Sequence, residues 1–276
     1  MKVKPKKSLG QHFLANDNIA RRIADALVSE TSPNTHEGAA KAASVSKTAP
    51  DAHGDEKMNV LEVGCGTGAL TQHLLQRSDI LLKGIEIDGE SIAYLRENLP
   101  AIMPRLYEAD FLKSDLRKLF PEGDFCVIGN FPYNISSQIF FKILEYKDDV
   151  PQVVGMLQKE VAERLSSGPG NKSYGILSVL LQAWYDIEYL FTVGENEFIP
   201  PPKVKSAVIR LRRNGRTELG CDDTRFKQIV KAAFNQRRKT LRNSLKAIGV
   251  DVPERYAGLR PEQMGVEDFI DLTKMI

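Results

Sequence analysis

Apolar and polar positions follow two different periods along this chain. Between residues 58 and 158, short apolar runs of strand length recur, and most are followed by a segment with apolar residues at helical spacing. The runs are MNVLEVG, LLKGIEID, RLYEAD, DFCVIGN and QVVGMLQ. Repeated strand–helix units of this length predict a parallel sheet that helices cover on both faces.

The apolar pattern changes over the last hundred or so residues, a length typical of one small domain. YGILSVLLQAWY has helical spacing, whereas DIEYLFTV and KSAVIRLR resemble strands with no helix between them. These two runs predict an antiparallel hairpin at the sheet edge, which completes a mostly parallel seven-stranded sheet. From about Gly215 the chain becomes helical and basic. We therefore predict an α/β domain over residues 1–213 and a small α-helical domain over residues 214–276.

Two segments precede the repeated units. Residues 18–30 carry apolar side chains at helical spacing, at Ile19, Ile23 and Leu27. Residues 31–57 are almost free of large apolar side chains, so this segment cannot bury enough surface to offset its ordering entropy. We expect a helix followed by a flexible insertion.

Composition narrows the class of protein. The 276 residues are 42% hydrophobic and 27% charged, with a net charge of +2, which is ordinary for a globular chain. No apolar run approaches the ~20 residues of a membrane span, and the basic start MKVKPKK leads into no secretory signal. Three scattered cysteines without a Cys-x-x-Cys pair argue against a zinc site or a disulfide framework. We expect a cytoplasmic protein without a metal, and a monomer, since nothing demands a dimer.

A glycine loop lies where the first strand of the repeated units gives way to a helix. LEVGCGTGAL contains Gly64, Gly66 and Gly68, and glycine permits positive φ and leaves room for a ligand against the backbone. Glu86 ends the next strand, where a carboxylate can accept hydrogen bonds from ribose hydroxyls. The alternative without a ligand is a plain tight turn.

Two cofactor classes fit this loop. The spacing Gly64-x-Gly66-x-x-Ala69 satisfies the relaxed dinucleotide fingerprint of NAD enzymes, and Gly64-x-Gly66-x-Gly68 fits the S-adenosylmethionine loop. Asp110 and Phe111 follow the third strand, where the carboxylate could accept from an adenine amine and the ring could pack on the base. A second strand-end acid favours S-adenosylmethionine, and no histidine fits the acid–base role of an NAD oxidoreductase.

The fourth strand ends in the turn Asn130-Phe131-Pro132-Tyr133. Pro132 disfavours the helical region for Phe131, so the Phe131 carbonyl should project beside the Asn130 side chain. Two acceptors aimed at one point suit an exocyclic amine, which has two hydrogens to donate, and Tyr133 offers a face to the base. They would favour a pyramidal nitrogen whose lone pair points at a methyl donor. The alternative is a plain loop whose rings belong to the core.

Basic residues gather near both ends of the chain. Residues 224–250 contain eight Lys and Arg and no acidic residue, together with a helical apolar stripe that includes Phe234, Leu241 and Leu245. One face would pack and the other would meet nucleic-acid phosphates. The lysines at positions 2, 4, 6 and 7 either add to this surface or form a floppy solubilising arm.

Seven motifs occur in order: KKSLGQHFL, LEVGCGTGALT, IEID, EADF, GNFPYNISS, MLQKEVAERL and FIPPPKVKSAV. Together they resemble the KsgA/RsmA family of ribosomal RNA adenine dimethyltransferases, over nearly the whole chain except 31–57. The resemblance implies a Rossmann-like class I methyltransferase fold and S-adenosyl-L-methionine as cofactor. It also implies dimethylation of two adjacent adenosines in the 3′-terminal hairpin of small-subunit (16S) rRNA within the immature 30S subunit.

The resemblance further implies a role for individual residues. Cofactor contacts would come from His12, Leu14, Gly64, Gly66, Gly68, Glu86, Asp110 and Asn130. The catalytic turn would be Asn130, Phe131, Pro132 and Tyr133, with Phe198 of FIPPP as a second ring for the base. Phe131 replaces the family's usual Leu and Cys65 a common Pro, both at positions where the backbone carries the role.

Two other functions remain open on the sequence. One is methylation of large-subunit RNA, as in antibiotic-resistance relatives; the FIPPPKVKSA and MLQKEVAERL stretches favour the small subunit instead. The other is a ribosome-assembly factor that binds RNA and in which catalysis is secondary.

Overall fold

The computed structural model describes residues 3–28, 57–121 and 123–276. The predicted flexible insertion at 31–57 therefore lies outside the described residues, apart from Lys57. Within the described ranges, no helix combines the length and the apolar character needed to cross a bilayer.

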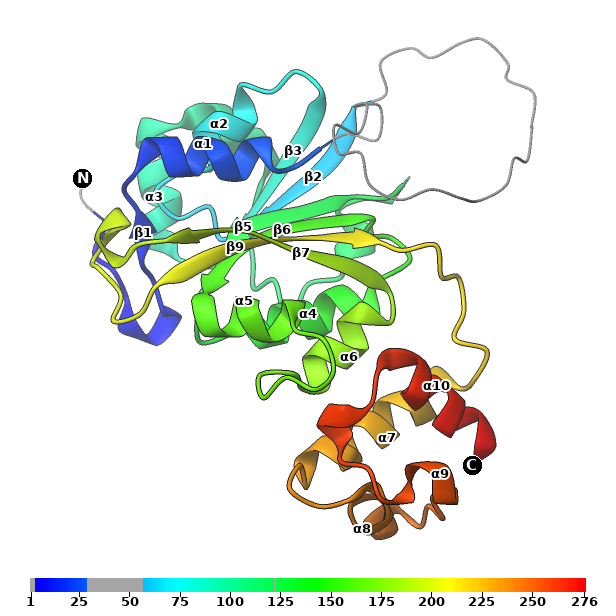
Figure 1. The fold of residues 1–276 in the computed structure, drawn as a ribbon. Coiled ribbons are helices and arrows are strands. Elements are labelled where there is room, and N and C mark those ends of the chain that lie inside the picture. The colour runs from blue at the N-terminus through cyan, green and yellow to red at the C-terminus, as the bar shows by residue number, and fades with distance from the viewer. Residues whose placement is uncertain (1–2, 29–56, 122) are drawn as a thin grey trace, which may run out of the picture.

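A seven-stranded sheet forms the centre of the molecule (Figure 1). Its order is β4 (Leu106–Glu108), β3 (Ile80–Glu86), β2 (Met58–Val63), β5 (Cys126–Asn130), β6 (Gln152–Gln158), β9 (Ser206–Arg213) and β7 (Tyr185–Val193). Pairing is parallel from β4 to β6, whereas β9 is antiparallel to both of its neighbours. The predicted mostly parallel sheet, with an antiparallel pair at its edge, is confirmed.

Burial along the strands explains their sequences. β5 and β6 are buried at nearly every position because helices cover both faces of the sheet. Val127 and Ile128 are neighbours in β5, yet they belong to two separate apolar clusters, one on each face. The edge strand β7 is instead only partly buried along most of its length.

Helices form a layer on each side of the sheet (Figure 1). One layer contains α1 (Asp17–Asp25), α2 (Thr71–Leu75) and α3 (Gly89–Asn98). The other contains α4 (Ser136–Glu145), α5 (Lys159–Ser166) and α6 (Ile176–Gln182). The predicted helix near the amino terminus is present as α1 but ends at Asp25, earlier than predicted; Asn16 caps its start by accepting a hydrogen bond from the Ile19 N–H at 3.2 Å.

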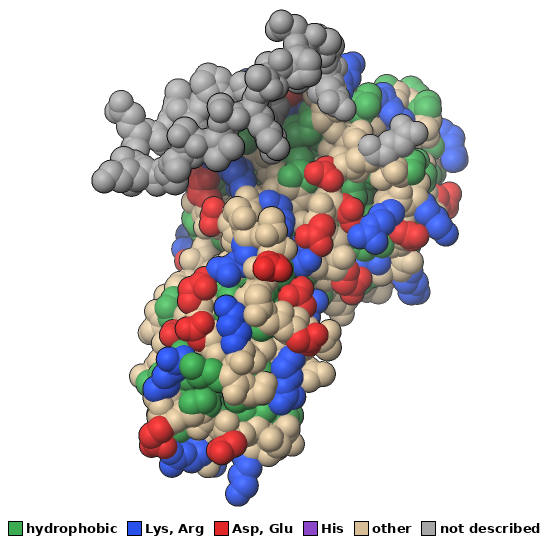
Figure 2. All heavy atoms as spheres, turned by 90° about the vertical axis from the view of Figure 1, so that its right-hand side faces the viewer, with side chains coloured by type: hydrophobic (Ala, Val, Ile, Leu, Met, Phe, Trp, Pro, Cys, Tyr) green, Lys and Arg blue, Asp and Glu red, His purple; other side chains and the backbone are tan. Residues whose placement is uncertain are grey.

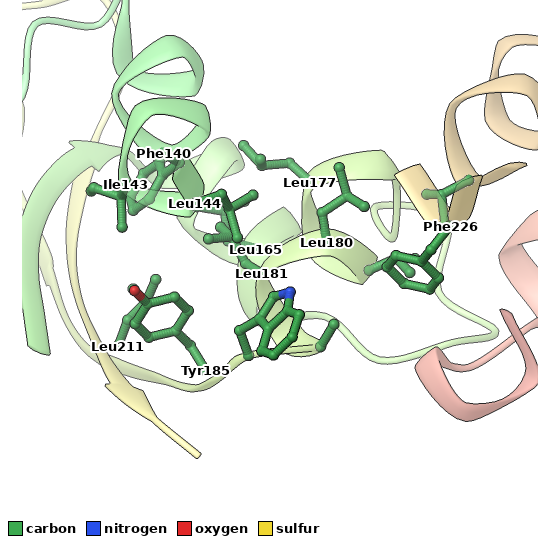
Figure 3. Packing of buried hydrophobic residues seen from close by; sticks show 14 of the residues in the cluster. Phe140, Ile143, Leu144, Leu165, Leu177, Leu180, Leu181, Tyr185, Leu211 and Phe226 are labelled. Carbon is green, nitrogen blue, oxygen red and sulfur yellow. The ribbon is translucent and has the colours of Figure 1, made fainter. Parts of the chain in front are cut away.

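After β9 the described chain forms helices and no further strand. They are α7 (Asp223–Asn235), α8 (Leu241–Leu245), α9 (Glu254–Ala257) and α10 (Val266–Met275), with short 3-10 turns between them. Phe226 of α7 lies beside Leu180 of α6 in the same apolar cluster as the sheet (Figure 3). β9 thus ends where the domain boundary was predicted, but the apolar core continues across that point.

A second, two-stranded sheet was not predicted. β1 (Phe13–Leu14) pairs antiparallel with β8 (Phe198–Ile199), which joins the amino-terminal arm to the segment before β9. Strands of two residues carry no readable alternation of apolar and polar positions. Only the tertiary structure reveals this connection.

Candidate active site

A cavity of about 230 Å³ opens at the carboxyl ends of the parallel strands. This is the edge at which ligands bind in open α/β sheets. Nine predicted site residues line it, and they come from four strand ends and the amino-terminal arm: His12, Gly64, Gly66, Glu86, Asp110, Asn130, Phe131, Pro132 and Tyr133. The fold therefore brings together residues that are as far apart as His12 and Tyr133 in sequence.

The glycine loop has the backbone shape that requires glycine. Gly64, Gly66 and Gly68 have φ values of 76°, 53° and 80°, a region that other residues rarely adopt. No atom lies within 4 Å of where a Gly64 Cβ would stand, so the cavity approaches the bare backbone there. Gly68 is not on the cavity wall, and its Cβ would lie 3.0 Å from Leu95 and Leu99. Gly68 therefore allows close packing of the loop against these two leucines and does not contact the cavity.

Glu86 is held in place by backbone donors. Its carboxylate accepts hydrogen bonds from the N–H groups of Gly66, Ile87 and Asp88, at 2.8, 2.9 and 2.8 Å. Burial raises the pKa of this carboxyl, and those three bonds act in the opposite direction. The side chain fixes the glycine loop and still borders the cavity.

Asp110 borders the cavity on the adjoining side. Its carboxylate accepts a hydrogen bond from the Leu112 N–H at 2.9 Å and lies 3.6 Å from the Lys113 ammonium. Phe111 and Ile87 add apolar surface to the same cavity, and Ile87 is 52% exposed. The sequence analysis missed Ile87, although an apolar residue between two acids at a strand end was visible in IEID. Two carboxylates and this apolar surface fit the ribose and adenine of S-adenosylmethionine.

The orientation of Asn130 is set by the amino-terminal arm. Its amide nitrogen donates to the His12 carbonyl at 2.9 Å. Because a carbonyl can only accept, the amide oxygen must lie on the other side of the group, where it is available as an acceptor. The Phe131 N–H donates to the Met156 carbonyl at 2.9 Å, and within the described chain no donor reaches the Phe131 carbonyl. Both predicted acceptors are therefore available at the turn.

The Phe131 ring lies in the core, and only the backbone of this residue can serve a ligand. The ring is fully buried and packs edge-on against Phe140, with 5.8 Å between ring centroids. It sits over Gly129 and Gly155, which are direct partners on β5 and β6. A Cβ on Gly155 would come within 2.5 Å of the ring, so this pair of glycines makes the space for Phe131.

Tyr133 and His12 form a stacked pair at the cavity. Their ring centroids are 5.3 Å apart with an interplanar angle of 27°. The Tyr133 hydroxyl shares a hydrogen bond with Ser206, and burial raises its pKa. His12 Nδ1 lies 2.8 Å from the Pro200 carbonyl, so Nδ1 carries the hydrogen. Tyr133 is thus fixed from two sides.

Leu14 and Phe198 are not on the cavity wall. They face each other in the β1–β8 sheet and are 7% and 2% exposed. A ring so deeply buried has no free face, so the prediction of Phe198 as a second stacking ring is wrong for this structure. The pair instead joins the arm to the rest of the site by apolar packing.

Lys6 and Gln11 of the amino-terminal arm bind the buried Asp88, a set of contacts that the sequence did not predict; we call these three residues the latch. The Lys6 ammonium pairs with Asp88 and lies 3.3 Å from Glu90, while the Gln11 amide donates to Asp88 at 3.1 Å. Burial alone would raise the pKa of Asp88, but the bonds from Lys6, Gln11 and Ser91 outweigh it and lower the pKa to about 2. The arm is therefore attached, and the expectation of a floppy arm is wrong from Lys6 onward.

A buried acid lies beneath the glycine loop. Glu62 is 1% exposed, and its Oε2 has no hydrogen-bond partner in the described structure. Burial raises the pKa of Glu62 to about 7, and the nearby charge of Glu86 acts in the same direction.

Among the described residues, no group of three or more His, Cys, Asp and Glu side chains could hold a metal ion.

Known proteins resemble this chain along almost its full length. The family model described as ribosomal RNA adenine dimethylase matches residues 2–260. The chain belongs to the ribosomal RNA adenine dimethylase family. This membership confirms the predicted enzyme class, a methyltransferase that uses S-adenosylmethionine, and it removes the NAD alternative.

Close relatives of this family member have a common name. A protein of Parabacteroides distasonis named ribosomal RNA small subunit methyltransferase A is 56% identical, covering 98% of this chain and 93% of its own. One of the same name from Cytophaga hutchinsonii is 51% identical, covering 100% and 98%.

Two solved structures share the fold of this adenine dimethylase. A dimethyladenosine transferase from Plasmodium falciparum is 23% identical with a TM-score of 0.70, over 95% of this chain and 96% of that one. The 23S rRNA methyltransferase ErmE is 25% identical with a TM-score of 0.62, over 95% and 99%. The predicted class I methyltransferase fold is confirmed.

Proposed function

We propose that this protein dimethylates the exocyclic amines of two adjacent adenosines in the 3′-terminal hairpin of small-subunit rRNA. The observation that carries the proposal is the free acceptor pair of Asn130 and Phe131 on the wall of the cavity that the glycine loop and two acids border. The small subunit is preferred because relatives more than 50% identical carry that name.

The residues of the chain divide the work. Gly64, Glu86 and Asp110 would hold S-adenosylmethionine, which supplies an electrophilic methyl group when bound. The Asn130 amide oxygen and the Phe131 carbonyl would accept the two hydrogens of the target amine. Good orientation of this kind is worth roughly 7–11 kcal/mol of barrier. No strong base is needed, because the nitrogen becomes cationic as the N–C bond forms and the donor's S–C bond breaks, and its proton is then acidic enough to pass to water.

Tyr133 would present its open face to the target base. The other face already stacks on His12, and the bond to Ser206 keeps the ring from turning. Base–aromatic stacking contributes about 1–3 kcal/mol per base. A preformed ring therefore lowers the cost of receiving an adenine that has left its RNA stack.

Asn130→Ala tests the acceptor pair. We expect it to lower the rate of methyl transfer by about 100-fold or more, because one of two orienting contacts is lost. Binding of S-adenosylmethionine, measured by calorimetry, should change much less. Asn243→Ala, an exposed amide on α8, is the matched control. Full activity in Asn130→Ala would contradict the amine clamp.

Large-subunit RNA remains the second candidate because ErmE shares the fold at 25% identity. Both rRNAs, each incubated with the protein and labelled methyl donor, should be digested and analysed by mass spectrometry. We expect dimethyladenosine in the small-subunit hairpin only. Label in the large-subunit RNA alone would replace the first proposal by the second.

We further propose that the substrate is an immature 30S subunit, that the protein acts as a monomer, and that it works in the cytoplasm, where bacterial subunits assemble. Residues 1–213 would carry the chemistry and residues 214–276 would add RNA affinity. Comparing methylation of immature and mature particles, separated on sucrose gradients, tests which particle is the substrate. Light scattering tests whether the protein is a monomer.

The basic stretch 224–250 supports RNA binding, but less strongly than its sequence suggested. Arg242 pairs with Glu254, and Arg237 lies 3.8 Å from Glu262. Figure 2 shows basic and acidic side chains side by side on this helical group, at the bottom of the view. Arg238, Lys239 and Lys246 are exposed and have no ion pair within the described chain.

Replacing Arg238, Lys239 and Lys246 by Gln should reduce the salt dependence of binding to small subunits, by about 0.7 to 0.9 in log–log slope for each lost phosphate contact. Cofactor binding should not change. A slope equal to that of the wild-type protein would show that these side chains are merely solvated.

A further inference from the structure

The loop at residues 200–205 lies beside two residues of the cavity wall, His12 and Tyr133. It connects β8 to β9 and is fastened at three points. The Pro200 carbonyl lies 2.8 Å from His12 Nδ1, and the Lys205 carbonyl accepts from the Lys159 N–H at 2.9 Å. Ser206, the next residue, bonds the Tyr133 hydroxyl. The loop therefore has a fixed position beside the proposed stacking ring.

Exposed basic and apolar side chains stand together on this loop and on Ile199, which precedes it. Ile199 is 64% exposed and Val204 is 44% exposed. Lys203 and Lys205 are exposed and have no ion pair in the described structure. Lys7, which directly precedes the cavity-lining Ser8, is likewise exposed and has no ion pair in the described chain. We call these five residues the mouth rim.

The mouth rim differs from an ordinary solvated face. Lys203 and Lys205 flank the exposed Val204 and have no ion pair in the described chain, whereas Lys6 is paired with Asp88. RNA offers anionic phosphates together with the flat faces of sugars and unstacked bases. Lys205 directly precedes Ser206, which bonds the Tyr133 hydroxyl, so the strand next to an adenine held at Tyr133 would pass close to this loop.

We propose that the mouth rim binds the RNA strand on either side of the target adenosine. Lys7, Lys203 and Lys205 contact phosphates, and Ile199 and Val204 pack against the adjacent sugars or bases. The inference rests on the proposed function, because it takes the base at Tyr133 as its starting point. Single-stranded loop RNA is the class of ligand that this surface fits.

The test is the double variant Lys203→Gln/Lys205→Gln, with Lys57→Gln/Lys118→Gln as a control of equal charge. The control lysines are exposed and lie outside the cavity wall. Binding of a small-subunit hairpin RNA is measured over a range of salt, followed by methylation kinetics. For the rim variant we expect a slope reduced by about 1.4, a raised KM for RNA and an unchanged Kd for S-adenosylmethionine. The control should match the wild type.

A second variant separates packing from charge. Ile199→Ser/Val204→Ser should weaken hairpin binding about three- to tenfold without changing the salt slope, since no charge is lost. Equal slopes and KM values for the Lys203→Gln/Lys205→Gln variant and the control would overturn the inference. So would a defect seen only on protein-containing subunits, because the surface would then recognise protein. If the wild-type enzyme methylates no rRNA, the proposed function itself falls.

Discussion

The two walls of the active site are held by different forces. The turn at Asn130–Tyr133 rests on the core, where the Phe131 ring fills the space over Gly129 and Gly155. The amino-terminal arm, which orients Asn130 through the His12 carbonyl, is held by the polar contacts of Lys6 and Gln11 with Asp88 as well as by its pairing with β8. Packing is short-ranged and insensitive to salt, whereas an ion pair responds to salt and pH. One wall should therefore be rigid and the other adjustable.

The largest expected effect comes from disturbing the rigid wall. Gly155→Ala would push a methyl group to 2.5 Å from the Phe131 ring, and such overpacking costs about 1–3 kcal/mol. Because a displacement of 1 Å at reacting groups can cost about 100-fold, we expect kcat to fall by up to that factor. Steady-state methylation kinetics provide the measurement.

Combining Gly155→Ala with Phe131→Leu should restore part of the activity, because leucine is smaller than phenylalanine and leaves room for the new methyl group. Gly258→Ala, where nothing lies within 4 Å of the new Cβ, serves as the control. If Gly155→Ala retains the wild-type kcat, then core packing does not hold the turn in place.

An intermediate effect is expected from loosening the adjustable wall. Lys6→Gln removes the partner of Asp88 and should weaken S-adenosylmethionine binding about three- to tenfold, a modest loss because Lys6 is partly exposed. Lys7→Gln, one residue further along and without an ion pair in the described chain, should leave cofactor affinity unchanged. Calorimetry at low and high salt compares the two. Equal affinities at low salt would mean that the latch does not shape the cavity.

The smallest expected effect is the change in stability when Asp88, the carboxylate of the latch, is protonated in acid. The pKa of Asp88 is lowered from 3.8 to about 2, so its contribution to stability is complete above pH ~4 and is lost as the pH falls toward 2. In Lys6→Gln the midpoint should move up toward the ordinary value. NMR of the labelled carboxyl carbon follows both midpoints, and a wild-type midpoint near 3.8 would show that the latch is open in solution.

The sequence was enough to locate the residues at the strand ends, because each of them stands where an apolar run stops. Gly64, Glu86, Asp110 and Asn130 each follow an apolar run, and parallel strands bring their carboxyl ends to one edge. It failed at Phe198, whose side chain was taken for a base-stacking ring. A two-residue strand has no period that reveals which way its side chains point, and Phe198 packs inward.

Charge was the other point at which the sequence misled. Lys4, Lys6 and Lys7 look alike in the sequence, yet Lys6 has a buried carboxylate as partner and the other two remain exposed. Residues 224–250 contain no acid, but folding brings Glu254 and Glu262 to two of their arginines. Ion pairing depends on residues distant in sequence, so a local count of charges cannot predict it.

The sequence by itself determined the strands of the central sheet in their order along the chain, the glycine loop, the strand-end acids and the polar turn, because these depend on local spacing and on which side chains resist burial. Tertiary structure alone decided which of the rings line the cavity and which of the lysines are paired. It also fixed how the arm closes over Asn130, because that closure depends on contacts between segments more than a hundred residues apart, such as His12 with Asn130 and with Pro200.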